Sequence, residues 1–282
     1  MTYGELYKFT LNELKDCTDS PSVEAGMLFR HCFGFDRVKI SVNSDKSADG
    51  EAVELLYKCI CKRKKFIPIQ YILGESIFYD FDFIVGDGVL IPRPETEILV
   101  DEALNFIKES GIANPVVYDL CSGSGCVGIS IARLLPYAKV YLFEKSDSAL
   151  EFIKQNVELN QVTNVQVFKC DIFDGVSSEL PLPDVLVSNP PYIPRADIET
   201  LQPEVKKEPV MALDGGDDGL DFYRCIRNKW LSEINTSVFF ALEFGIYQSD
   251  DVLKLFSSVS DDARIIKDFN CIDRVICGNT VK

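Results

Sequence analysis

Apolar residues recur at helical spacing through the first seventy positions of the chain. Three stretches carry this pattern, residues 6–14, 25–32 and 52–60. A polar stretch at 43–50 separates the last two and has the composition of a loop. Apolar side chains three and four positions apart lie on one face of a helix and are buried together. The pattern therefore predicts a small helical domain over residues 1–70, without a catalytic motif of its own.

The pattern changes to alternation after Pro68. Residues 71–75 and 78–85 alternate apolar and polar side chains, as half-buried strands do. Gly86-Asp87-Gly88 has the composition of a turn. We therefore expect a β-hairpin linker over residues 71–90, between two domains.

From residue 91 to the carboxyl end, short apolar runs alternate with amphipathic segments. The runs that predict strands are residues 116–120, 140–144, 165–168, 185–188, 238–244, 264–266 and 274–277. The segments that predict helices are residues 98–108, 127–135, 150–159, 220–234 and 249–256. Strands that alternate with helices are typical of a parallel, doubly wound α/β sheet. Residues 91–282 are therefore predicted to form one Rossmann-like α/β domain.

The run Ser188-Asn189-Pro190-Pro191-Tyr192 closes the predicted strand at 185–188. Two consecutive prolines cannot donate to a β-ladder, so they end the strand and stiffen the backbone after it. Asn189 is thereby predicted at the carboxyl end of a strand, where open α/β sheets bind their ligands. A plain strand followed by a proline turn is the alternative. Asn-Pro-Pro-Tyr resembles the signature of methyltransferases that act on planar nitrogen of amides or exocyclic amines.

A glycine-rich loop, Gly123-x-Gly125-x-x-Gly128, lies between a predicted strand and a predicted helix. Such glycines let the backbone approach a nucleotide closely, and Glu144 follows about 20 residues later, where a carboxylate accepts from ribose hydroxyls. Asp171 follows the third strand of the domain and is placed to accept from an adenine amine. The alternatives are a structural glycine turn and, for Asp171, an ordinary turn at a strand end.

The position of the single histidine separates two classes of nucleotide cofactor. A nicotinamide enzyme needs an acid or base, often histidine, at the site of hydride transfer. His31 is the only histidine and lies in the predicted helical domain. S-adenosylmethionine carries a ribose without a pyrophosphate and fits the same strand-end geometry. The missing histidine therefore argues against a nicotinamide enzyme, and S-adenosylmethionine is the other cofactor that this geometry suits.

The amino-acid composition indicates which binding partners and which cellular compartment to expect. The chain has 29 Lys and Arg against 44 Asp and Glu, a net charge of −15, which repels phosphate backbones. The basic run Lys62–Lys65 is interpreted as a solvated helix end, favoured by the helix dipole. Ten scattered cysteines without a Cys-x-x-Cys pair argue against a zinc site and for reduced thiols in the cytoplasm. The sequence predicts neither a membrane span nor a secretory signal.

Six motifs occur in a fixed order along the chain. They are Gln70-Tyr71-Ile72-Leu73-Gly74, Ile91-Pro92-Arg93-Pro94-Glu95-Thr96-Glu97, Asp119-Leu120-Cys121-Ser122-Gly123-Ser124-Gly125, Ser188-Asn189-Pro190-Pro191-Tyr192-Ile193, Glu208-Pro209 and Gly215-Gly216-x-x-Gly219-Leu220. In this combination the chain resembles the release-factor glutamine methyltransferase family of the HemK/PrmC type. The resemblance covers nearly the whole chain and weakens over the first seventy residues.

The resemblance implies a fold, a reaction and a partner. The fold is a seven-stranded, Rossmann-like, S-adenosylmethionine-dependent methyltransferase domain behind a small helical domain. The reaction methylates the side-chain nitrogen (N5) of the glutamine in the Gly-Gly-Gln motif of peptide chain release factors and leaves S-adenosyl-L-homocysteine. Residues 1–70 are expected to dock this protein substrate, and neither a nucleic acid nor a membrane is expected as a partner. A nucleic-acid exocyclic-amine methyltransferase and a nicotinamide-dependent oxidoreductase stay open as alternatives.

The resemblance also implies roles for individual residues. Family cofactor positions correspond to Cys121, Ser122, Gly123, Ser124, Gly125, Glu144, Asp171, Ile172 and Asn189. Substrate positions correspond to Asn189, Pro190, Pro191 and Tyr192. In catalysis, the side-chain oxygen of Asn189 and the backbone carbonyl of Pro190 are expected to accept from the substrate amide, against a flat wall supplied by Tyr192.

Two residues depart from the family pattern. Cys121 stands where glycine is frequent, so the backbone there is expected to suit a residue with a Cβ. Glu144 stands where aspartate is frequent, and it keeps the carboxylate that a ribose contact requires. The segment Arg93–Thr96 is a candidate cover for the cofactor.

Overall fold

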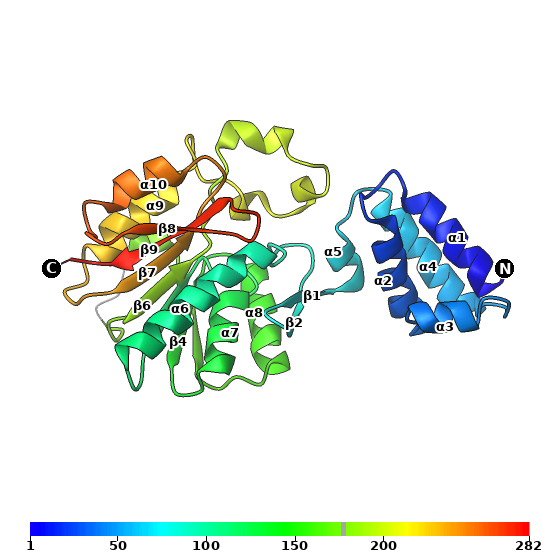
Figure 1. Ribbon diagram of the computed structural model, residues 1–282, viewed down its shortest axis with the longest axis horizontal. Helices are drawn as coiled ribbons and strands as arrows, with labels where there is room; N and C mark the ends of the chain where they lie inside the picture. Colours follow the sequence, from blue (N-terminus) through cyan, green and yellow to red (C-terminus); the bar gives the residue numbers. More distant parts are fainter. Residues whose placement is uncertain (176–178, 282) are drawn as a thin grey trace. The chain divides into compact units, whose positions relative to one another are not determined.

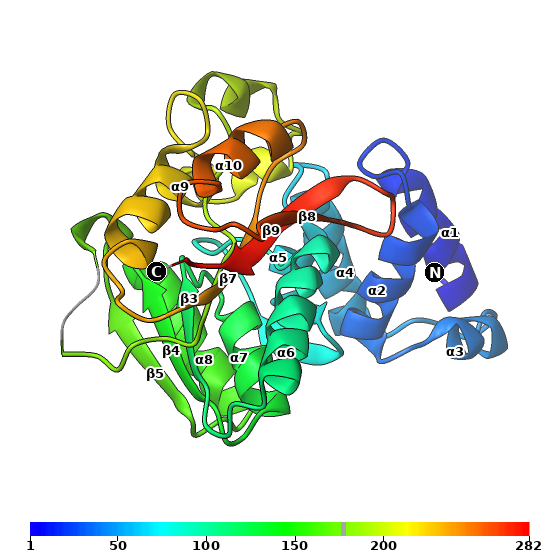
Figure 2. The same cartoon turned by 60° about the vertical axis from the view of Figure 1, so that its left-hand side comes forward.

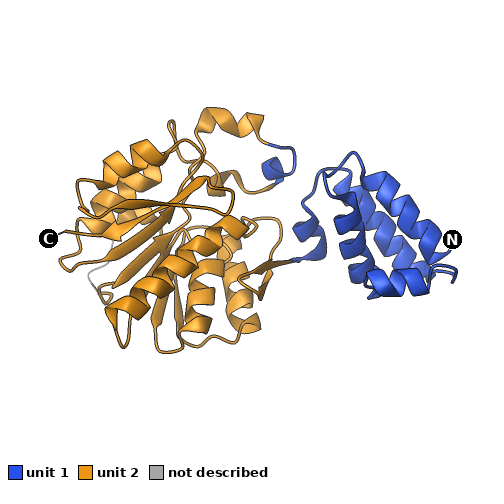
Figure 3. Ribbon diagram, viewed as in Figure 1, with its two compact units in different colours: residues 1–75, 202–207 blue, residues 76–201, 208–282 orange. Residues whose placement is uncertain are grey.

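The computed structural model describes residues 1–175 and 179–281, which divide into two compact units (Figure 3). Unit 1 comprises Met1–Glu75 and Gln202–Lys207, and unit 2 comprises Ser76–Leu201 and Glu208–Lys282. Unit 1 therefore contains a short segment that the sequence assigned to the second domain. The predicted boundaries at residues 70 and 90 stay predictions.

Unit 1 is helical, as predicted. Its helices are α1 (Tyr3–Leu14), α2 (Pro21–Phe33), α3 (Arg37–Val42), α4 (Gly50–Arg63) and α5 (Ile69–Leu73). The side chain of Thr2 accepts from the backbone N–H of Glu5 at 3.2 Å, and the Glu5 carboxylate accepts from the backbone N–H of Thr2 at 2.9 Å. This reciprocal cap starts α1 at Tyr3, ahead of the apolar stripe at 6–14. Leu28, Phe29 and Leu56 are fully buried in the core between the helices.

Arg63 corrects the interpretation of the basic run as a solvated helix end. Its neighbours Lys62, Lys64 and Lys65 are exposed, but Arg63 is only 1% exposed. It lies one helical turn beyond the buried stripe of α4 and therefore points into the same core. There its guanidinium donates to both carboxylate oxygens of Glu24, at 2.7 and 3.1 Å, and forms an ion pair with Glu204 at 2.8 Å.

The hairpin is confirmed, but its position and its turn differ from the prediction. Strands β1 (Glu75–Phe78) and β2 (Phe81–Ile84) pair around Tyr79 and Asp80, whose φ angles are 52° and 60°. Two consecutive left-handed residues are typical of the tight turn that matches strand twist. The predicted strand at 71–75 is wrong over residues 71–73, which form the end of α5, because Pro68 and the left-handed Gly74 bound a short helix there.

Within the described residues, seven strands form the large sheet, in the order β5-β4-β3-β6-β7-β9-β8 (Figure 1). They are β3 (Val116–Leu120), β4 (Lys139–Glu144), β5 (Val165–Lys169), β6 (Val185–Ser188), β7 (Phe239–Glu243), β8 (Arg264–Lys267) and β9 (Asp273–Asn279). β3 to β7 run parallel, which confirms the α/β prediction, but β9 is antiparallel to both of its neighbours. The loop between β8 and β9 is too short for a helical crossover, so the two strands form a hairpin.

Helices cover both faces of this sheet (Figures 1 and 2). α6 (Glu97–Ser110), α7 (Cys126–Leu134) and α8 (Asp147–Leu159) share a core with one face. The other face packs against α9 (Asp221–Cys225), the π-helix η6 (Ile226–Leu231) and α10 (Ser249–Phe256). The single helix predicted over 220–234 is therefore an α-helix that continues as a π-helix. The short 3₁₀ segments are η1 (Pro94–Thr96), η2 (Ile172–Asp174), η3 (Arg195–Thr200), η4 (Val205–Lys207) and η5 (Val210–Ala212).

The strand order reverses between β3 and β6. From β3 the chain passes outward to β4 and β5 and then returns to the other side of β3 at β6. At such a switch point the loops that follow the two strands diverge and leave a crevice at their carboxyl ends. The Asn189 run and the glycine-rich loop both begin at this edge. In the part of the chain that the structure describes, no helix has the length and apolarity needed to span a membrane.

We expect Arg63→Ala to destabilise the protein by about 3–5 kcal/mol, because the buried Glu24 carboxylate loses its counter-charge. Denaturant unfolding monitored by circular dichroism measures this loss. Lys64→Ala is the matched control, since the neighbouring exposed Lys64 pairs with Glu13 at the surface. Equal unfolding midpoints for the two variants would contradict the structural role of Arg63.

Candidate active site

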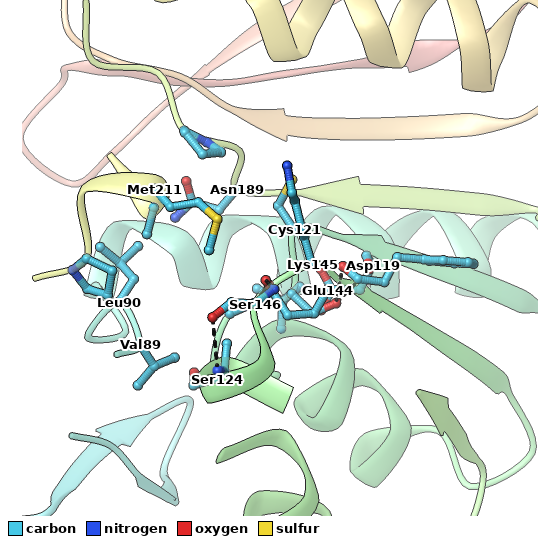
Figure 4. A pocket seen from close by; sticks show the side chains of 18 of the residues that line it. Val89, Leu90, Asp119, Cys121, Ser124, Glu144, Lys145, Ser146, Asn189 and Met211 are labelled. Atoms are coloured by element: carbon cyan, nitrogen blue, oxygen red, sulfur yellow. Dashed lines mark hydrogen bonds between the residues drawn. The ribbon is translucent and has the colours of Figure 1, made fainter. Parts of the chain in front are cut away.

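A pocket of about 1040 Å³, counting its open mouth, lies at the carboxyl ends of β3 to β6 (Figure 4). All of its lining residues belong to unit 2. The lining side chains after the strand ends include Cys121, Ser122, Gly123, Ser124, Glu144, Lys145, Ser146, Asp171, Ile172, Asn189 and Pro191. Val89 and Leu90 lie at one side of the pocket, and Met211 lies near Asn189 (Figure 4).

The glycine-rich loop has the strand–loop–helix context that the sequence predicted. Gly125 has a φ of 80°, a conformation that favours glycine, and α7 begins directly after it. At Gly128 a Cβ would lie 2.1 Å from Leu142, so only glycine lets α7 pack this closely on β4. The Gly128 N–H donates to the buried Asp119 carboxylate at 2.9 Å.

Cys121 contradicts the expectation of a backbone that suits a side chain. Its φ is 56°, in the left-handed region, which costs a residue with a Cβ about 1–2 kcal/mol. Cys121 follows β3 directly, where the chain turns away from the sheet to form the loop. The strain is therefore located in the wall of the pocket.

Glu144 is held against the glycine-rich loop. Its carboxylate accepts from the Gly123 N–H at 2.8 Å and from the Ser146 N–H at 2.7 Å. Burial raises the pKa of Glu144, while these backbone donors act in the opposite direction. A carboxylate has about four acceptor positions, so the two bonds leave capacity for ligand hydroxyls. Glu144 thus lines the pocket with its carboxylate fixed in place, and the ribose contact stays a prediction.

Asp171 lies across the same pocket and is oriented by two neighbours. It accepts from the Phe173 N–H at 3.1 Å and forms an ion pair with Lys145 at 2.7 Å. The hydrogen bond from Lys145 lowers the pKa of Asp171, so the carboxylate is ionised and available as an acceptor. The adjacent Ile172 is buried and adds an apolar surface to the lining.

The Asn189 run is connected to Thr96, which the sequence analysis placed in the candidate cover Arg93–Thr96, and to Glu243, to which it gave no role. The Asn189 side-chain N–H donates to the Thr96 hydroxyl at 3.0 Å, and Thr96 donates to the Glu243 carboxylate at 2.5 Å. The Tyr192 hydroxyl reaches the other oxygen of Glu243 at 3.5 Å. Asn189 and Pro191 line the pocket, whereas Pro190, Tyr192 and the predicted cofactor residue Gly125 are not part of its lining.

Glu208 was also missed, although the Glu208-Pro209 motif marked its position. This buried carboxylate accepts from the Ile91 N–H at 3.0 Å and pairs with Arg93. It therefore fixes the segment Arg93–Thr96, whose residues Arg93 and Thr96 line the pocket. The candidate cover Arg93–Thr96 was the available signal for Thr96, and the Glu208-Pro209 motif was the signal for Glu208. Glu243 lies in no motif that the sequence analysis singled out. Within the described ranges, no group of three or more His, Cys, Asp or Glu side chains has an arrangement that could hold a metal ion.

Proteins of known function resemble the chain over almost its whole length. The release factor glutamine methyltransferase of Geobacter sulfurreducens is 39% identical over 262 residues, which cover 92% of this chain and 90% of that protein. The enzyme of the same name from Clostridium botulinum is 36% identical over 277 residues, 97% of this chain and 95% of its own. This chain belongs to the release factor glutamine methyltransferase family.

Two family models match within the chain. The PrmC N-terminal domain matches residues 5–74, and the methyltransferase small domain matches residues 96–207. Among solved structures, the catalytic domain of hMettl16 in complex with MAT2A 3′UTR hairpin 6 superposes with a TM-score of 0.57 and 14% identity, over 82% of each chain. At that identity the likeness shows the methyltransferase fold alone. The family assignment confirms the resemblance that the six motifs indicated.

We expect the stability of the Asp119→Asn variant to increase, relative to that of the parent protein, as the pH rises from 5 to 8. Burial raises the pKa of Asp119 to about 8, so the folded state favours the neutral acid. The stabilisation from that neutral form is complete at low pH and is lost as the pH rises through about 8. An asparagine stays neutral throughout. Melting temperatures across this range measure the difference, and Glu109→Gln, on the exposed side of α6, is the control. A difference that does not change with pH would contradict the buried titration.

Proposed function

We propose that this chain transfers the methyl group of S-adenosylmethionine to the side-chain amide nitrogen (N5) of the glutamine in the Gly-Gly-Gln motif of peptide chain release factors. The observation that carries the proposal is Asn189, held by Thr96 in the wall of the pocket. The family relatives of this chain bear the name of that activity over 90% or more of their own length.

The pocket residues fit the cofactor. Glu144 has acceptor capacity left for ribose hydroxyls, and Asp171 is an ionised acceptor for an amine. The left-handed glycines leave the loop backbone open to close approach. When bound, the cofactor supplies an electrophilic sulfonium methyl group. The remaining task for the protein is to place and orient a nucleophile.

An amide nitrogen is a poor nucleophile because its lone pair is delocalised into the carbonyl. The Asn189 oxygen and the Pro190 carbonyl are proposed to accept the two N–H bonds of the substrate amide. These acceptors stabilise the positive character that nitrogen gains as it loses conjugation, and they direct its lone pair at the methyl group. Holding the reactants in line is worth roughly 7–11 kcal/mol. Tyr192, below the pocket wall, is proposed to position this run through its hydroxyl.

The finer parts of the proposal concern the partner and the compartment. The lining of the pocket lies entirely in unit 2, and we assign to residues 1–70 the docking of the release factor. The net charge of −15 argues against a nucleic acid as a direct partner. Ten free cysteines suit a reducing compartment, for which we propose the cytoplasm.

We expect calorimetry to show binding of S-adenosylmethionine and no binding of NAD. Glu144→Ala removes the ribose acceptor and is expected to weaken cofactor affinity by about 10-fold or more, the effect of a lost hydrogen bond to a charged group. Glu151→Ala, an exposed carboxylate on α8, is the control. Binding of NAD alone would refute the cofactor assignment.

We expect Asn189→Ala to slow methyl transfer by roughly five- to 150-fold, because a substrate N–H is left without an acceptor at a cost of about 1–3 kcal/mol. The loss should appear mainly in kcat, since the contact strengthens as the lone pair is freed. Asn189→Asp should also be impaired. The assay is single-turnover transfer of labelled methyl to a purified release factor, followed by mass mapping of the glutamine. Transfer by Asn189→Ala at the parent rate would contradict the mechanism, and methyl found elsewhere would contradict the substrate.

A further inference from the structure

A chain of two hydrogen bonds runs from the end of β7 to the Asn189 side chain. Glu243, the last residue of β7, is 2% exposed and accepts from the Thr96 hydroxyl at 2.5 Å. Thr96, also 2% exposed, accepts in turn from the Asn189 side-chain N–H at 3.0 Å. The three residues come from distant parts of the sequence; the Thr96–Glu243 bond is buried, and the Asn189–Thr96 bond is partly buried at the pocket wall.

The hydrogens available to Glu243, Thr96 and Asn189 determine which group donates in each of these two hydrogen bonds. A threonine hydroxyl has one hydrogen, and an ionised carboxylate can only accept. While Glu243 is ionised, the Thr96 hydrogen must therefore point at Glu243, and Thr96 can only accept from Asn189. The atom of Asn189 that meets Thr96 is then the N–H, which leaves the side-chain oxygen for another donor.

We propose that Glu243 is a positioning residue for methyl transfer, which acts through Thr96 to present the oxygen, and not the nitrogen, of Asn189 to the substrate amide. This inference rests on the proposed function, in which Asn189 accepts from the substrate. Glu243 does not line the pocket, so it acts on Asn189 through the hydroxyl of Thr96, while its other oxygen contacts the Tyr192 hydroxyl at 3.5 Å.

Protonation of Glu243 allows donor and acceptor to exchange roles in both hydrogen bonds. A carboxylic acid can donate to Thr96, which then donates to Asn189 and selects the flipped amide. The flipped amide presents an N–H to the substrate N–H, and the acceptor is lost. Methyl transfer is therefore expected to fall as the pH drops below the pKa of Glu243.

Burial raises the pKa of Glu243 to about 7, which brings this change into the physiological range. The hydrogen bond from Thr96 and the cations Arg274 and Arg93 act in the opposite direction, and Glu95 adds to the rise. The Tyr223 hydroxyl donates to the Glu243 backbone carbonyl at 2.7 Å. The other titratable side chains coupled electrostatically to Glu243 are Tyr192, Tyr223 and Cys126, and burial raises the pKa of each of them.

The first test needs no protein substrate. Carbon-13 NMR of the full chain labelled at the Glu carboxyl groups identifies Glu243 as the resonance absent from Glu243→Gln. Nitrogen-15 NMR identifies the Asn189 side-chain amide in the same way with Asn189→Ala. We expect both resonances to titrate with one midpoint near pH 7, and the Asn189 change to vanish in Glu243→Gln. An Asn189 amide that is indifferent to the ionisation of Glu243 would overturn the proposal, whatever the enzyme methylates.

The second test measures the pH profile of single-turnover methyl transfer. We expect Glu243→Gln to be slower by about five-fold or more above pH 7, to lose the decline below pH 7, and to bind cofactor as the parent does. Thr96→Val should lose about five- to 150-fold, and Thr96→Ser, which keeps the hydroxyl, should stay within about two-fold of the parent. Glu102→Gln, a partly buried carboxylate of α6 paired with Arg264, is the control and should keep the parent profile.

The outcomes separate the two proposals. If the parent enzyme does not methylate a release factor, the proposed function fails, while the NMR titration still decides the coupling. If the parent methylates and Glu243→Gln matches its rate and its pH profile, the positioning role of Glu243 is refuted. A general packing defect would lower the rate at every pH and would not remove the acidic decline.

Discussion

The parallel alignment of β3, β4, β5 and β6 is the constraint on which the site depends. The register places Leu120 beside Phe143 on one side and beside Ser188 on the other, so the strands end at one edge. Parallel strands run in the same direction, so every loop that follows one of them starts at that edge of the sheet. The reversal of strand order at β3 and β6 opens a crevice there. The glycine-rich loop, Glu144, Asp171 and the Asn189 run then face a common space because their strands do.

Carboxylates buried at this edge hold the site together and lower its stability at neutral pH. Asp119 orients the start of α7 through Gly128, Glu144 orients the glycine-rich loop, and Glu243 orients Thr96. Burial raises the pKa of all three groups, so the folded protein binds their protons more tightly than the unfolded chain, and its stability falls as the pH rises toward neutral. The large apolar cores on both faces of the sheet offset that cost. A buried acceptor that is fixed in place orients its donors far better than an exposed one, which explains why such groups occur beside the pocket.

The segment Arg93–Thr96 joins distant parts of unit 2 at the pocket. Glu208 fixes its beginning through Arg93 and the Ile91 N–H, and Glu243 fixes its end through Thr96. The segment precedes α6 in sequence, whereas its partners follow the Asn189 run and end β7. Two of its residues, Arg93 and Thr96, line the pocket, and Thr96 connects it to Asn189. In unit 1, Arg63 has a comparable role, since it connects Glu24 of α2 with Glu204.

The sequence by itself determined what local patterns encode. Apolar periodicity located most helices and strands, glycines marked the loop before α7, and the two prolines placed Asn189 at a strand end, because each of these signals acts within a few residues. The motif order identified the family. Only the tertiary structure decided the direction of β9, the short helix at 69–73, the strained backbone of Cys121 and the burial of Arg63. The sequence also did not predict two long-range hydrogen bonds. One joins Thr96 to Glu243, 147 positions apart, and the other joins Ile91 to Glu208, 117 positions apart. Such pairings depend on which strands become neighbours in the sheet, and no pattern confined to a few consecutive residues specifies that.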